Sequence, residues 1–195
     1  MRLFFILAMS MFTGTLEPCD QDAALKFQQD LSDFYARDAK SPLMEPDKKD
    51  FKGLDFFEID ANFCVQAVFK RTPNEAPFRM KTTTSRLPEY VKYGVLYFSL
   101  GGKSLKLNVY QNLDLAKTGY SKLFLPFSDL TNGEQTYIGG RYLDLEIPAD
   151  ETATIDFNRA YNPYCAYNYA YSCPIVPMEN DLEVAVLAGV KKYKD

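Results

Sequence analysis

The sequence contains no histidine among its 195 residues. That absence excludes Ser-His-Asp triads, Cys-His dyads and the two-histidine zinc motif of metalloproteases. A metal site would have to use cysteine thiolates and carboxylates alone, so we expect neither a metal nor a cofactor. The chain also lacks the glycine-rich loops that cradle nucleotides and the G-x-S-x-G turn of serine hydrolases. These absences favour a protein that is not an enzyme, and they leave only carboxylate chemistry open.

Runs of basic residues are missing as well. The formal net charge is −4 and the isoelectric point is about 5.0. Proteins that bind nucleic acids carry a basic surface, so we expect no nucleic-acid partner. The composition, 47% hydrophobic and 25% charged, is typical of a globular domain, and the length is sufficient for one substantial core.

An apolar run of ten residues, LFFILAMSMF at positions 3–12, follows a charged start. It is too short to span a bilayer, which takes about 20 residues. The run predicts a secretory signal peptide over residues 1–19. Because Leu16 lies three residues before Cys19, a lipoprotein signal ending at Cys19 is the alternative. We therefore expect export to the periplasm or envelope, with any membrane attachment through a lipid on Cys19.

Residues 20–195 predict a single β-rich domain with one helix at its start. Apolar residues at helical spacing predict an amphipathic helix over residues 20–38: Phe27, Leu31, Phe34 and Tyr35. About eight later segments alternate as strands do, namely residues 62–69, 78–84, 90–100, 104–110, 123–127, 142–147, 153–157 and 182–187. Gly101 and Gly102 predict a tight hairpin turn. Both an antiparallel sandwich and a partly open barrel fit this pattern.

The stretch Asp156–Asn180 is unusual in its content of tyrosine, proline and cysteine. Three prolines interrupt any periodicity, so it cannot be one long helix or strand. Cys165 and Cys173 are eight residues apart, which suggests a disulfide if the protein is exported. A soft-metal site and two free thiols are the alternatives. Cys64 is expected to be a lone thiol.

Polar and aromatic side chains near this stretch are candidates for a binding site. Arginine can fix a polar group, and tyrosine can stack on a ligand. The candidates are Arg141, Asn158, Arg159, Tyr161, Asn162, Tyr164 and Tyr167. Asp129 and Asp156 are the candidates for a carboxylate pair in a hydrolase. The structural alternative is that the Asp and Asn residues only tie the loop to the sheet.

Several stretches after the signal region belong to one pattern. They are SPL (Ser41–Leu43), FKGLDFF (Phe51–Phe57), KLNVYQN (Lys106–Asn112), LFLPFSDLTNG (Leu123–Gly133), GGRYLDL (Gly139–Leu145), DFNRAYNPYCAYN (Asp156–Asn168), YSCPIVPMEN (Tyr171–Asn180) and AG (Ala188-Gly189). Together they resemble the uncharacterised bacterial family catalogued as domain of unknown function 1684. The resemblance implies no activity, because that family has no established one.

The resemblance groups seven residues as a shared signature: Arg141, Asp156, Asn158, Arg159, Asn162, Cys165 and Cys173. The chain departs from the family pattern at Gln135, where the family has glutamate, and at Ile138, where it has glycine. We therefore place no catalytic role at Gln135. Cys64 is also a departure, which agrees with an incidental thiol.

The expected function is that of an exported β-domain that binds a small polar ligand or a glycan through the Asp156–Asn180 loop. In this view Arg141 and Asp129 lie at the floor of a cleft, and the loop tyrosines stack on the ligand. A carboxylate-based hydrolase is one alternative. A structural envelope protein without a ligand is the other.

Overall fold

The computed structural model describes residues 19–194. The signal peptide predicted over residues 1–19 therefore lies outside the described residues, except for Cys19. Within the described range, no helix combines the length and the apolar character that crossing a bilayer requires.

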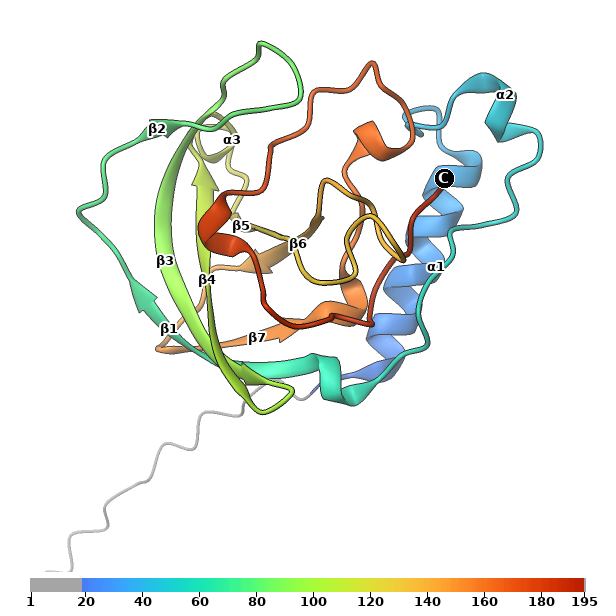
Figure 1. The fold of residues 1–195 in the computed structure, drawn as a ribbon. Helices are drawn as coiled ribbons and strands as arrows, with labels where there is room; N and C mark the ends of the chain where they lie inside the picture. The colour runs from blue at the N-terminus through green and yellow to red at the C-terminus, as the bar shows by residue number, and fades with distance from the viewer. Residues whose placement is uncertain (1–18, 195) are drawn as a thin grey trace, which may run out of the picture.

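One antiparallel sheet makes up most of the fold (Figure 1). Its seven strands are β1 (Cys64–Arg71), β2 (Phe78–Arg79), β3 (Glu89–Leu100), β4 (Lys103–Asn112), β5 (Lys122–Phe127), β6 (Arg141–Glu146) and β7 (Thr152–Asp156). Six strands follow the order β6-β5-β4-β3-β1-β7, and β2 pairs beside β3. The helices are α1 (Gln21–Arg37), α2 (Glu45–Lys48) and α3 (Leu113–Ala116), with 3-10 turns η1 (Ala61–Phe63), η2 (Phe157–Arg159), η3 (Tyr164–Ala166) and η4 (Met178–Asn180).

The sheet curls into a half-barrel (Figure 1), so the mainly β, antiparallel prediction is confirmed. It is one continuous sheet rather than two packed sheets, which corresponds to the partly open barrel and not to the sandwich. Residues 78–84 contain only the short β2, and this strand pairs with β3 instead of β1. Residues 182–187 form no strand. The first correction shortens one expected strand, and the second reduces the expected eight strands to seven.

The β3–β4 hairpin is where the sequence predicts it. Gly101 and Gly102 both have positive φ angles, 57° and 77°, as a primed two-residue turn requires. Alternate residues of the two strands point to the core, where Leu96, Leu107 and Val109 are fully buried. The core therefore follows directly from the period-two pattern of the sequence.

Helix α1 begins after Asp20, whose carboxylate accepts hydrogen bonds from the backbone nitrogens of Asp22 and Ala23 at 3.0 and 3.1 Å. The helix buries one face against the remainder of the domain. Gln28 Nε2 on this face donates to the carbonyl of Asn158 at 2.9 Å, and Tyr35 is 1% exposed. The helix is thus joined to the turn that follows β7.

A buried ion pair fixes the C-terminal segment inside the half-barrel. Arg141 Nη2 donates to Asp129 Oδ2 and to the carbonyl of Val186, both at 2.8 Å. Arg141 Nη1 donates to the carbonyls of Ala188 and Val190. The side chains of both ionised residues are 0% exposed. Burial lowers the pKa of Arg141 while the carboxylate of Asp129 opposes that shift.

Residues 182–187 do not form the predicted strand. Their alternating apolar residues do face the core, since Leu182 and Val186 are buried. Their backbone groups bind several different partners: the Val186 carbonyl accepts from Arg141, and the Val184 carbonyl accepts from the Leu130 nitrogen at 3.1 Å. Gly189 then turns with a φ of 76°, and a Cβ there would lie 2.7 Å from the carbonyl oxygen of Phe157. The segment crosses the concave side of the sheet toward α1 (Figure 1).

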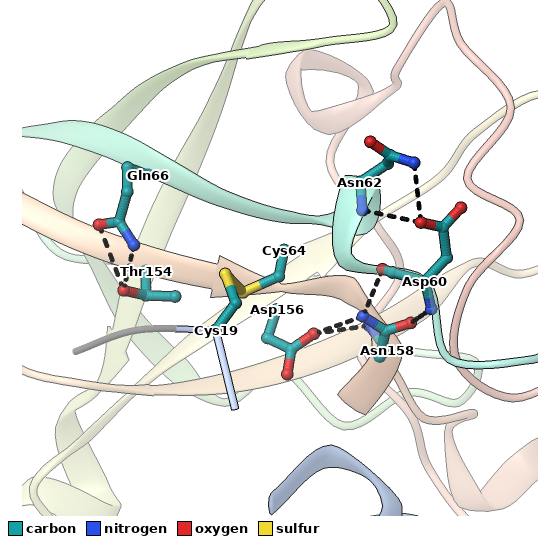
Figure 2. The surroundings of a disulfide bond; sticks show 8 residues. All are labelled: Cys19, Asp60, Asn62, Cys64, Gln66, Thr154, Asp156 and Asn158. Carbon is teal, nitrogen blue, oxygen red and sulfur yellow. Dashed lines mark hydrogen bonds between the residues drawn. A yellow bond between two sulfur atoms is a disulfide. The ribbon is translucent and has the colours of Figure 1, made fainter. Parts of the chain in front are cut away.

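The disulfide of the structure joins Cys19 to Cys64, with their Cα atoms 5.8 Å apart (Figure 2). Cys64 is therefore not a lone thiol. A sulfur bonded to another cysteine cannot carry a thioether-linked lipid, so the predicted lipidation of Cys19 is incompatible with this structure. The bond fastens the start of α1 to the start of β1.

The Arg141–Asp129 pair predicts a large effect of mutation on stability. Asp129→Ala leaves a guanidinium without its carboxylate in the protein interior, and we expect the free energy of unfolding to fall by about 3–5 kcal/mol. Urea unfolding measures the loss. The control is Asp30→Ala, which removes an exposed ion pair of equal length, 2.8 Å, with Lys26. Equal unfolding midpoints for the two variants would contradict the prediction.

The Cys19–Cys64 bond predicts a second loss of stability. Its removal in the Cys19→Ser/Cys64→Ser variant frees a chain segment with a sequence separation of 45 residues. We expect a loss of about 2–4 kcal/mol and faster hydrogen exchange in the first turns of α1. Adding dithiothreitol to the unmodified protein should lower the midpoint of its unfolding in guanidinium chloride by a similar amount. An unchanged midpoint in both experiments would show that the cross-link is not stabilising.

Candidate functional site

A groove of about 900 Å³ lies between β6 and β7, the two ends of the strand order. The chain passes directly from β6 to β7 through residues 147–151. After β7 it returns to β6, where Tyr142 and Tyr161 exchange backbone hydrogen bonds of 2.9 and 3.0 Å. Between these two connections the strands separate, and the space between them forms the groove.

The walls of the groove come from several parts of the chain. The first turns of α1 contribute Asp20, Ala23 and Phe27. Strands β1, β6 and β7 contribute both polar and apolar side chains, and the 147–151 connection closes one end. Cys19 and Cys64 also line the groove, so their disulfide holds the α1 wall in place.

The outward faces of β1 and β7 carry a row of paired polar side chains (Figure 2). Gln66 lies opposite Thr154 in the antiparallel register, and the two side chains are hydrogen-bonded at 2.9 and 3.3 Å. Cys64 lies opposite Asp156 one step along the same face. Because these residues alternate with Val65, Ala67 and other core residues, the β-strand period directs them to the groove.

Asp156 is held in position by Asn158. One carboxylate oxygen of Asp156 accepts from the backbone nitrogen and from Nδ2 of Asn158, at 3.1 and 2.9 Å. Asn158 in turn binds both the backbone nitrogen and the carbonyl of Asp60 at 3.0 Å (Figure 2). The second oxygen of Asp156 points away from Asn158 in Figure 2. Asp156 thus caps η2 and also lines the groove.

Asp144 and Tyr161 form the opposite end of the site. The Tyr161 hydroxyl donates to Asp144 Oδ2 at 2.9 Å. Asp144 is accessible to solvent, but the surrounding protein still reduces the hydration of its carboxylate, and this raises its pKa. The Tyr161 hydrogen bond and the charge of Lys122 lower the same pKa. Burial, followed by the negative charge of Asp144, raises the pKa of Tyr161.

Carboxylates outnumber cations along the groove. The charged side chains that line it are Asp20, Asp144, Glu146, Asp150, Asp156, Lys122 and Arg159. Lys122 Nζ lies 3.3 Å from Glu146, and the guanidinium of Arg159 lies 5.1 Å from the centre of the Phe27 ring. In the part of the chain that the structure covers, no three cysteine or acidic residues are grouped so that they could hold a metal ion.

The structure brings three of the predicted site residues to the groove: Asp156, Arg159 and Tyr161. It does not bring the others. Asn158 and Asn162 are buried at 2% and 0% exposure and bind backbone groups. Both side chains tie the loop to neighbouring backbone, which is the structural alternative that the sequence left open.

Arg141 and Asp129 do not form the floor of a cleft. Arg141 is fully buried, and its two terminal nitrogens donate to Asp129 and to backbone carbonyls, whereas its Nε has no hydrogen-bond partner among the described residues. Asp129 Oδ1 accepts from the nitrogen and hydroxyl of Thr131 and from the nitrogen of Val186. A ligand cannot reach either side chain, and Asp129 cannot act with Asp156 as a catalytic pair, because it does not line the groove.

The other two predicted tyrosines pack within a separate aromatic cluster. The rings of Tyr167 and Tyr35 lie 4.7 Å apart, and Tyr167 is only 4% exposed. Tyr164 is 37% exposed, and its ring contacts Tyr35 and Tyr171. Neither tyrosine lines the groove. The loop tyrosines therefore serve mainly as a small core between the loop and α1.

The expected disulfide between Cys165 and Cys173 is absent, and both residues are free thiols. They are nevertheless neighbours, because the backbone nitrogen of Cys165 donates to the Cys173 sulfur at 3.0 Å. Four cysteines allow three pairings, and their spacing along the chain does not choose among them. The fold decides the pairing by placing Cys19 beside Cys64.

Sequence reasoning missed the contributions of α1, β1 and β6 to the groove. Phe27 lies on the apolar stripe of the helix, so its spacing predicts a core residue. Asp144 lies at an outward-facing position of its strand, so the alternation predicts an ordinary solvent-exposed residue. Gln66 carries no motif. Only the placement of α1 beside β7 brings these side chains together, and no local pattern encodes that placement.

The contact between Tyr161 and Asp144 predicts a change in titration. In Tyr161→Phe the carboxylate loses a hydrogen bond that favours its ionised form, so the pKa of Asp144 should rise further above its ordinary value. The chemical shift of the Asp144 carboxyl carbon, followed by NMR across an acidic pH series, measures this pKa. Tyr169→Phe is the control, because Tyr169 is 83% exposed. An unchanged Asp144 pKa in Tyr161→Phe would show that the hydrogen bond does not form in solution.

Similarity to known proteins identifies the family of this chain. No curated protein is significantly similar to the chain. The chain is similar to an uncharacterized protein of Haloarcula marismortui whose solution NMR structure is known. The two share 33% sequence identity with a TM-score of 0.70, over 88% of this chain and 93% of the other. A family model described as "Protein of unknown function (DUF1684)" matches residues 49–191, which hold all seven strands and most of the groove, and the chain belongs to that family.

Proposed function

We propose that the protein is an exported β-domain that binds a small hydroxyl-rich ligand, such as a mono- or disaccharide, in the groove between β6 and β7. The observation that supports this proposal is the groove itself. Its volume of about 900 Å³ lies in the range of small-molecule sites, and it combines apolar walls with a few polar side chains.

The charges of the groove favour a neutral ligand with many hydroxyl groups. Carboxylates such as Asp144 and Asp156 accept hydrogen bonds from hydroxyls, and Arg159 and Lys122 donate to their oxygens. An anionic ligand would meet more carboxylates than cations. The aromatic rings of Phe27 and Tyr161 offer apolar surface for the carbon face of a sugar ring.

Export is the second part of the proposal. The apolar run behind a charged start supports it, because this pattern is typical of signal peptides. The Cys19–Cys64 bond agrees with an oxidising compartment, since structural disulfides form and persist there. Because this bond needs Cys19 in the mature chain, the proposed signal peptide would be cleaved before Cys19.

The groove also supports a second candidate, a carboxylate-based hydrolase. Asp144 has a raised pKa and shares the groove with a second carboxylate, Asp156, and a raised pKa is characteristic of a carboxyl group that donates a proton. Asp144→Asn separates the two functions. A binding protein keeps most of its affinity, whereas a hydrolase loses turnover and its bell-shaped pH profile.

Ligand binding is testable with a panel of mono- and disaccharides. We expect at least one sugar to raise the melting temperature and to shift NMR signals of groove residues. Arg159→Ala should weaken its binding by about tenfold, or ~1.4 kcal/mol, because it removes a charged donor. Arg37→Ala is the matched control, since Arg37 lies at the other end of α1 and pairs only with Asp33 at 3.1 Å. A panel without any shift, or equal affinities in both variants, would exclude this groove as a sugar site.

A further inference from the structure

Two free thiols lie in contact at a place that the groove does not include. Cys165 is the middle residue of η3, and Cys173 follows eight residues later. The backbone nitrogen of Cys165 donates to the Cys173 sulfur at 3.0 Å. Neither residue lines the groove.

The chain around Cys173 is fixed by backbone pairing with Thr83. The Cys173 nitrogen donates to the Thr83 hydroxyl at 3.1 Å, and the Thr83 nitrogen donates to the Cys173 carbonyl at 2.9 Å. The next residue, Pro174, is bridged to Thr82. Cys173 therefore keeps its position when Cys165 reacts.

The two cysteines differ in their access to solvent. Cys165 is half-buried, whereas Cys173 is only 5% exposed. The Tyr137 hydroxyl lies 3.8 Å from the Cys165 sulfur and can donate to it. A small molecule from solvent would meet Cys165 first, with Cys173 directly behind it.

The environment also separates the acidities of the two thiols. The hydrogen bond from Cys173, followed by those from Tyr137, the backbone and Thr83, lowers the pKa of Cys165 to about 7. The same bond raises the pKa of Cys173 far above its usual range. The other titratable groups near the pair are Tyr35, Tyr142 and Arg86. The environment therefore favours the thiolate of Cys165 over the thiolate of Cys173.

We propose that Cys165 and Cys173 form a redox-active dithiol, in which Cys165 attacks a hydroperoxide and Cys173 resolves the product. The inference does not depend on the groove or its ligand. It also differs from a permanent structural cross-link, because it requires the pair to cycle between two free thiols and a disulfide.

The reaction has two steps. The Cys165 thiolate attacks the terminal oxygen of the hydroperoxide, an S–O bond forms, the O–O bond breaks, and the alkoxide leaves and takes a proton from solvent. The Cys173 sulfur then attacks the Cys165 sulfenic acid, an S–S bond forms, and hydroxide leaves with the Cys173 proton as water. Two thiols are oxidised by two electrons and one hydroperoxide is reduced to an alcohol and water. An external dithiol restores the reduced pair.

The first test is the pH dependence of alkylation in the unmodified protein. The rate constant for alkylation of Cys165 by iodoacetamide should rise with pH and reach half of its maximum near pH 7. At pH 7 its reaction should be about threefold faster than that of N-acetylcysteine, because the larger thiolate fraction outweighs the lower nucleophilicity. Tyr137→Phe should move the half-maximal rate to higher pH. The ordinary pKa of a cysteine thiol is about 8.5. If the rate reaches half of its maximum only at that pH or above it, the proposal is overturned.

The second test uses hydrogen peroxide followed by mass spectrometry of tryptic peptides. The unmodified protein should lose about 2 Da in the peptides that contain Cys165 and Cys173, and dithiothreitol should restore the mass. Cys173→Ser should accumulate a sulfenic acid at position 165 that dimedone traps, and Cys165→Ser should give neither product. Independent over-oxidation of the two thiols without a cross-link would overturn the proposal. The experiment on the unmodified protein remains decisive if a variant fails to fold.

Discussion

Moving a guanidinium and a carboxylate from water into a protein interior costs several kcal/mol for each ion. Arg141 and Asp129 offset this cost by binding each other and by binding the backbone around them. The guanidinium reaches carbonyls of the C-terminal segment, at Val186 and Ala188, and the carboxylate reaches the Thr131 turn. The planar, multiply donating arginine suits this role, whereas a lysine would offer a single point charge.

This pair determines which part of the half-barrel the chain itself fills. Because it holds residues 182–190 across the concave side of the sheet, the inside of the half-barrel is filled with side chains such as Leu182 and Val186. The remaining space lies between β6 and β7, where the Tyr142–Tyr161 bridge fixes one end. The Cys19–Cys64 bond then places α1 as the wall that completes the groove.

The Asp156–Asn180 stretch serves several purposes at once. Its asparagines satisfy buried backbone groups; Asn180, for example, binds the carbonyls of Asn108 and Pro126 while its own oxygen accepts from the Asn108 nitrogen. Satisfying such groups is what allows a loop without strands to be rigid. The stretch gives only its first residues to the groove, and its two cysteines lie apart from it as a reduced pair.

The sequence by itself determined the β class, the β3–β4 hairpin with its glycine turn and the start of α1 at Asp20, because each depends on local periodicity or backbone preference. Three of its candidate site residues, Asp156, Arg159 and Tyr161, line the groove. Only the tertiary structure decided that Arg141 is buried, that Cys19 pairs with Cys64, and that residues 182–187 bind a guanidinium instead of a strand. These outcomes depend on contacts between residues far apart in the chain, and such contacts leave no periodic trace in the sequence.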